Sequence, residues 1–172
     1  MNDSISIISR NVIEVRDALG LSQKKFSELL NISTATLVNI ESGNKSFRFK
    51  SLDEITNKID IPLSDLSKES FKPPKNLREG LLKRYEKDPS VFVILNSSPS
   101  IAYVLKYKIL NTTFLNEPKE TNEIKKFLNK NGFVFKGNSL HQTMKRLPSL
   151  FQIAKHITKK NTFVYSKNTS AK

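Results

Sequence analysis

Apolar residues recur at helical spacing from the start of the chain. Ile8, Val12, Val15 and Leu19 are four, three and four positions apart, which places them on one face of an α-helix. Gly20 follows directly and is typical of a helix end. The pattern therefore predicts a helix over residues 8–19.

Two short helices with their own capping residues are predicted next. Ser22 and Ser33 each precede apolar residues at helical spacing, and serine is a favoured helix N-cap. Asn31 lies between the two helices and tolerates the left-handed conformation of a tight turn. Gly43 stands where the third helix is expected to end.

Two further helices complete a predicted all-helical unit of about 60 residues. Residues 51–54 (Ser-Leu-Asp-Glu) have the spacing of a capping box and predict the start of a fourth helix. Leu52, Ile55 and Ile59 would share one side of it. Residues 62–66 (Pro-Leu-Ser-Asp-Leu) predict a short fifth helix.

These elements carry a recognisable set of motifs. The set comprises Ser22-Gln23 at the opening of the second helix, residues 40–43 (Ile-Glu-Ser-Gly) at the end of the third, and the later Pro-Leu-x-x-Leu of residues 62–66. Together they resemble the helix-turn-helix of the Cro and phage-repressor (XRE) family. The resemblance covers residues 8–67 and implies a five-helix repressor-type domain.

The resemblance also implies roles for individual residues. In that family the second helix crosses the phosphate backbone and the third lies in the major groove. Gln23 would contact phosphate and hold the recognition helix, and Glu41 matches the family's structural acid. The implied DNA-contacting residues of this domain are Gln23, Thr34, Ala35, Thr36, Asn39 and Lys45.

The chain departs from the family at the turn and at two positions of the third helix. The turn glycine is Asn31, and Thr34 and Asn39 occupy positions that often hold Arg or Lys. Asn39 nevertheless has the amide group that pairs bidentately with adenine.

Helical periodicity stops at residues 68–76, where two adjacent prolines predict an extended linker. Residues 77–118 are predicted to form a helical connecting or dimerisation segment. Within it the apolar runs 91–95 and 101–105 are too short to distinguish helix from strand by pattern alone. We favour helices, which would contribute to a core or a dimer interface.

Residues 119–168 predict a basic domain with one β-hairpin, followed by a tail over residues 169–172. A helix after Thr121 is followed by a turn at Asn131-Gly132, and residues 139–142 have the spacing of a second capping box. Pro148 is expected to end that second helix.

Alternating apolar residues predict the hairpin. They are Phe151, Ile153 and Ile157 on one strand and Phe163 and Tyr165 on the other. Four polar residues, 158–161, would form its tip. The order helix, turn, helix, basic hairpin resembles a winged helix, so the predicted fold class is mainly α with a winged-helix-like C-terminal domain.

Charge is distributed unevenly along the chain, whose formal net charge is +13. Residues 1–66 hold eight Lys and Arg against nine Asp and Glu, a net charge of −1. The remaining residues hold 21 against 7, a net charge of +14. Such an excess attracts polyanions, most commonly nucleic acid, and membrane phosphate is the lesser option.

The helix predicted to begin at Ser139 places polar groups suited to bases and phosphates on one face, because residues four apart are neighbours on a helix. Lys159 and Lys160 would lie at the hairpin tip. The DNA-binding candidates of the C-terminal domain are Asn138, Ser139, His141, Gln142, Lys145, Arg146, Lys159 and Lys160.

Composition argues against catalysis and against metal or cofactor binding. The chain has no Cys and only two His, so a thiol nucleophile and a cysteine-ligated metal are excluded. No apolar run approaches the length of a membrane span. We therefore expect a cytoplasmic binding protein that needs no metal or cofactor.

Two functions fit the sequence. The first is a sequence-specific, double-stranded DNA-binding transcriptional regulator, acting as a homodimer. The second is an antitoxin-like or other interaction protein whose basic C-terminal domain binds an acidic protein partner while the N-terminal domain autoregulates. The operator, any effector, and repression against activation stay open.

Overall fold

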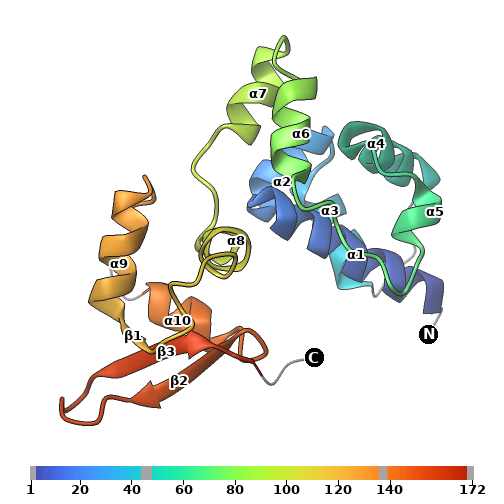
Figure 1. Cartoon of the computed structure of the whole chain (residues 1–172). Helices are drawn as coiled ribbons and strands as arrows, with labels where there is room; N and C mark the ends of the chain where they lie inside the picture. Colours follow the sequence, from blue (N-terminus) through green and yellow to red (C-terminus); the bar gives the residue numbers. More distant parts are fainter. Residues whose placement is uncertain (1–2, 44–47, 136–138, 170–172) are drawn as a thin grey trace. The chain divides into compact units, whose positions relative to one another are not determined.

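The computed structural model describes residues 3–43, 48–135 and 139–169 (Figure 1). The chain divides into two compact units, Met1–Pro99 and Ser100–Lys172, here called the N-terminal unit and the C-terminal unit. The described residues of the N-terminal unit form helices and loops, whereas the C-terminal unit combines helices with a small sheet.

The N-terminal unit contains the five predicted helices and two more. Their bounds are α1 (Asp3–Leu19), α2 (Gln23–Leu30), α3 (Thr34–Ser42), α4 (Phe49–Ile59), α5 (Leu63–Leu66), α6 (Leu77–Arg84) and α7 (Pro89–Leu95). The prediction of a five-helix domain at the N-terminus is therefore confirmed.

The capping residues explain where α2 and α3 begin and end. The side chains of Ser22 and Ser33 each accept a hydrogen bond from a backbone N–H in the first turn of the following helix. Asn31 ends α2 at φ 56° and Gly43 ends α3 at φ 64°, both in the left-handed region. These four predictions are confirmed, and they fix the short turn that separates the two helices.

The capping box predicted at residues 51–54 was wrong. Helix α4 begins at Phe49 after Arg48, whose side chain makes no capping hydrogen bond. Ser51 lies inside the first turn, and its backbone N–H donates to the Arg48 carbonyl at 3.0 Å. A polar motif near a helix start does not identify the first residue, because a helix can begin without a side-chain cap.

Helices α6 and α7 are part of the N-terminal unit. Helix α6 packs on α1, and α7 packs on α2. The buried Arg78 of α6 donates hydrogen bonds to the carbonyl oxygens of Leu19 and Ser97. Residues 68–76 contain neither helix nor strand. The helical segment predicted over residues 77–118 is thus divided between the two units.

The C-terminal unit consists of helices and short β-strands. Its elements are α8 (Ile101–Tyr103), which continues as the π-helix η1 (Val104–Ile109), then β1 (Lys119–Glu120), α9 (Thr121–Lys130), α10 (Ser139–Lys145), β2 (Phe151–Lys155) and β3 (Phe163–Lys167). The apolar runs 91–95 and 101–105 are both helical, as predicted.

The three strands form one antiparallel sheet in the order β1-β3-β2 (Figure 1). The hairpin of β2 and β3 was predicted, whereas the two-residue β1 was not. Ile157 was placed wrongly on the apolar face of a strand. The chain turns after Lys155, where the His156 N–H donates to the Thr162 carbonyl at 2.8 Å, and Ile157 is fully exposed in the loop.

A single apolar core holds the C-terminal unit together. It is formed by side chains from η1, α9, α10 and the sheet. Leu140 and Met144 point into it from α10, and both are fully buried. Because these two residues fix one face of α10 inward, Gln142 and Lys145 are left on the outer face.

Candidate nucleic-acid interface

Helix α3 presents a mixed polar and apolar face to solvent. Thr34, Ala35 and Asn39 are exposed. Thr36 is half-buried. Val38 was not identified from the sequence, yet 41% of it is exposed between these residues. Leu37 and Ile40 are three positions apart on the buried side of α3. This helical spacing was the feature of the sequence from which the outward position of Val38 could have been predicted.

The side chain of Thr34 also fixes α3 against α2. Its Oγ1 lies 2.9 Å from Ser27 Oγ, which itself donates to the Lys24 carbonyl at 2.8 Å. The Ser27 hydroxyl proton is thereby used, so Thr34 is the donor of the pair. The Thr34 oxygen keeps a lone pair for an outside donor.

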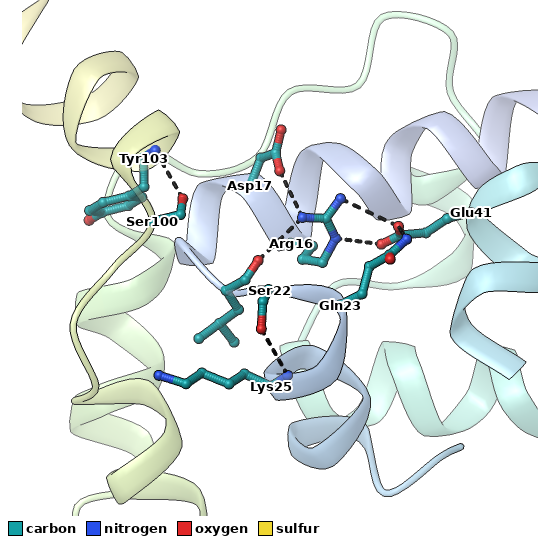
Figure 2. A network of polar contacts seen from close by, with 9 residues as sticks. Arg16, Asp17, Ser22, Gln23, Lys25, Glu41, Ser100 and Tyr103 are labelled. Carbon is teal, nitrogen blue, oxygen red and sulfur yellow. Dashed lines mark hydrogen bonds and ion pairs between the residues drawn. The ribbon is translucent and has the colours of Figure 1, made fainter. Parts of the chain in front are cut away.

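A carboxylate on α3 ties three helices together (Figure 2). Glu41 Oε1 accepts a hydrogen bond from Arg16 Nε of α1 at 2.6 Å. Glu41 Oε2 accepts one from Gln23 Nε2 of α2 at 2.7 Å. Arg16 also donates to the Leu21 carbonyl at 3.2 Å and to Asp17 at 3.1 Å.

Burial strengthens the electrostatic attraction within this network relative to that in a surface ion pair. The side chains of Glu41 and Arg16 are 5% and 17% exposed, so water screens their attraction weakly. Gln23 is exposed at the start of α2 and at the same time holds α3 in place. The arrangement fixes the angle and depth at which the outer face of α3 is presented.

The C-terminal unit presents a second exposed helix. Gln142, Lys145 and Arg146 are exposed on the outer side of α10 and just after it, whereas Ser139 is half-buried. The structure thus brings together three of the residues predicted from the sequence. Two other candidates, Lys45 and Asn138, lie outside the described residues.

His141 is half-buried and bonded to the sheet. Its Nδ1 lies 2.6 Å from the hydroxyl of Tyr165, which also accepts a hydrogen bond from Thr121 at 3.4 Å. The ring centroid is 5.3 Å from that of Phe163. These contacts join α10 to β3 and to the start of α9, so His141 positions the helix.

The hairpin loop carries the two predicted lysines, and both are exposed. Lys159 Nζ is ion-paired with Glu120, and His156 Nε2 lies 3.4 Å from the same carboxylate oxygen. The hydrogen bond and charge of Lys159 lower the pKa of Glu120 below its ordinary value. Lys160 is exposed as well, and no contact within the described residues joins it to Glu120.

Glu120 was not identified from the sequence, because it lies far along the chain from both His141 and His156. The antiparallel pairing of β1 with β3 sets Glu120 opposite Val164, close to the hairpin loop. A strand of two residues is too short to produce a recognisable pattern in the sequence. The contact is therefore a product of the tertiary fold.

A shallow hollow of about 380 Å³ connects helix and hairpin. His141 and Gln142 of α10 line it from one side, and Asn161, Thr162 and Phe163 line it from the other. The exposed part of α10 and the hairpin therefore belong to one continuous surface of the C-terminal unit.

The two units differ in net charge as well as in fold. Residues 100–172 hold fourteen Lys and Arg against three Asp and Glu, a net charge of +11. Residues 1–99 hold fifteen against thirteen, a net charge of +2. A long-range positive field therefore originates mainly from the C-terminal unit.

The described residues offer neither a metal site nor a membrane span. No three His, Cys, Asp or Glu side chains within residues 3–43, 48–135 and 139–169 are grouped to hold a metal ion. No helix in the same ranges is long and apolar enough to cross a bilayer.

Comparison with known families gave a match for the part of the chain that contains α3. Residues 12–66 match a family profile described as Helix-turn-helix, within the 8–67 range expected from the motifs. No significant similarity was found to a curated protein or to a solved structure.

We expect the loss of the Arg16–Glu41 contact to lower the free energy of unfolding substantially. Glu41→Ala leaves the mostly buried Arg16 guanidinium without its main partner, and breaking such a pair costs about 3 kcal/mol. Urea unfolding of the full chain measures the loss. Asp17→Ala removes the more exposed partner of the same guanidinium and serves as the control, with an expected loss under about 1 kcal/mol. Equal losses for the two variants would contradict the assignment.

Proposed function

We propose that this chain, whose residues 12–66 form a helix-turn-helix domain of the Cro and phage-repressor (XRE) type, is a sequence-specific DNA-binding transcriptional regulator. In this family of DNA-binding regulators the third helix lies in the major groove. The observation that carries the proposal is the exposed face of α3, held from behind by the contacts of Glu41.

The residues on that face suit base recognition. Asn39 has the donor and acceptor needed for a bidentate pair with adenine, and the methyl groups of Ala35 and Val38 suit contact with the methyl group of thymine. We expect Gln23, which is exposed at the start of α2, to contact phosphate. The absence of Arg and Lys on α3 means that most phosphate contacts must come from elsewhere in the protein.

The C-terminal unit is proposed as that second DNA-binding module, with a winged-helix-like fold. Its helix-strand-helix-helix-strand-strand order and its β1-β3-β2 sheet support the proposal. Helix α10 would enter a groove with Gln142, Lys145 and Arg146, and the hairpin would be the wing. The net charge of +11 supplies the attraction to phosphate.

We further propose a cytoplasmic homodimer without enzymatic activity. One helix-turn-helix contacts few base pairs, and dimers extend the site by binding two half-sites. Helix α7 offers a candidate contact, because Val93 is 68% exposed. A repressor that blocks transcription by occupying its operator needs no more than this binding activity.

A second candidate function rests on the same charge. An acidic protein is also attracted to a unit of net charge +11, as in an antitoxin-like protein whose N-terminal domain autoregulates. The two candidates differ in whether the lysines of the C-terminal unit contribute to DNA affinity, which is measurable.

Asn39→Ala tests recognition by α3. On a duplex selected by the protein from a random pool, the variant is expected to lose about 1–3 kcal/mol of binding free energy, with relaxed preference at one base pair. Band-shift titration measures both. Asn57→Ala, an exposed asparagine on α4, is the matched control and should bind as the unaltered protein does. Unchanged affinity for Asn39→Ala would refute its role.

The double variant Lys145→Ala/Lys160→Ala tests the C-terminal module. Each lost phosphate contact lowers the slope of log affinity against log salt by nearly one, so the slope should fall by about two with base preference unchanged. Fluorescence anisotropy of the full chain across a salt series measures it. Lys83→Ala/Lys87→Ala, which removes two exposed lysines of the N-terminal unit, is the control. An unaltered slope would favour the acidic protein partner.

A further inference from the structure

The loop between β2 and β3 presents a large apolar side chain to water. Ile157 is 100% exposed, although it lies within a loop of otherwise polar residues. A single exposed hydrophobic residue is ordinary on a protein surface. Whether Ile157 has a role in binding depends on the conformation of the loop and on the residues that surround it.

The loop that carries Ile157 has a defined conformation. The His156 N–H donates to the Thr162 carbonyl at 2.8 Å and closes the hairpin. His156 Nδ1 accepts hydrogen bonds from the backbone N–H groups of Thr158 at 3.1 Å and Lys159 at 3.2 Å. The imidazole thus caps the turn that presents Ile157, so little conformational entropy remains to be lost when the loop binds a partner.

The tautomer of His156 links this turn to the sheet. Because Nδ1 accepts two N–H groups, the neutral ring carries its proton on Nε2. Nε2 faces Glu120 Oε1 at 3.4 Å, and the same oxygen is ion-paired with Lys159. The loop is therefore fastened to the end of β1 as well as closed on itself.

Basic residues flank Ile157 on both sides. Lys155 precedes it by two positions, and Lys159 and Lys160 follow it. All three are exposed. An apolar tip between cations matches a groove in which the apolar faces of stacked bases lie between two rows of phosphates.

We propose that Ile157 is an apolar wedge that the hairpin inserts into the minor groove of duplex DNA, partly unstacking one base step. The proposal rests on the proposed DNA binding of the C-terminal unit. Proteins that bind the minor groove frequently insert an isoleucine, leucine or phenylalanine in this way and bend the duplex. DNA is favoured over a lipid surface because the hairpin shares one hollow with His141 and Gln142 of α10.

The test compares Ile157→Ser with the unaltered full chain on the selected duplex. The duplex carries the fluorescent base 2-aminopurine at successive positions and a donor and acceptor dye at its ends. The unaltered protein should raise 2-aminopurine fluorescence at one step and shorten the distance between the ends. Ile157→Ser should abolish both signals and weaken binding roughly tenfold, with the salt slope unchanged because no charge is lost.

Two controls accompany the variant. Val134→Ser removes a similarly exposed apolar side chain from the loop between α9 and α10 and should leave both fluorescence signals unchanged. Thermal unfolding of Ile157→Ser should match that of the unaltered chain, because Ile157 has no buried surface to lose.

The outcomes separate this inference from the function on which it rests. If Lys145→Ala/Lys160→Ala lowers the salt slope while Ile157→Ser changes neither affinity nor fluorescence, the wedge is refuted and the DNA-binding module stands. If the lysine variant leaves the slope unchanged, both are refuted. If Ile157→Ser weakens binding to phosphatidylserine vesicles and leaves duplex affinity intact, the exposed isoleucine belongs to a lipid-binding surface instead.

Discussion

The buried carboxylate of Glu41 makes the contacts on which the orientation of α3 in the N-terminal unit depends. It projects from α3 and accepts hydrogen bonds from Arg16 of α1 and Gln23 of α2. Apolar packing by Leu37 and Ile40 buries one side of α3 but does not by itself fix a short helix along its axis. The carboxylate supplies directional contacts at the end of the helix, so the outer face is presented in one orientation.

The C-terminal unit uses the same physical arrangement with different residues. Leu140 and Met144 bury one side of α10, and the contact between His141 and the Tyr165 hydroxyl joins the helix to the sheet. Glu120 then fastens the hairpin loop through Lys159. In both units a short exposed helix is held from behind by polar contacts. The units differ in net charge, and this difference is the basis of the proposed division between base recognition by α3 and phosphate attraction by the basic unit.

Local features of the fold were predictable from the sequence, and contacts between distant segments were not. Ser22 caps α2 with its side chain, and Asn31 and Gly43 adopt the left-handed backbone conformation. All three act on residues next to them in the chain, so their positions sufficed to place the ends of α2 and α3. The exposed face of α3 followed from helical periodicity, although Val38 was overlooked because it is apolar. Glu120 was missed because its contact with Lys159 depends on β1, which has only two residues. Ile157 was misassigned because alternation alone does not mark the residue at which a strand ends.

The most direct test of this account is whether both units contact the same DNA. Backbone amide signals of the 15N-labelled full chain would be followed by NMR as the selected duplex is added. The account predicts that Ala35 and Asn39 of α3 and Gln142 and Lys160 of the C-terminal unit shift together, with saturation at one DNA concentration. Shifts confined to the N-terminal unit, with the signals of Gln142 and Lys160 unchanged at saturation, would contradict it.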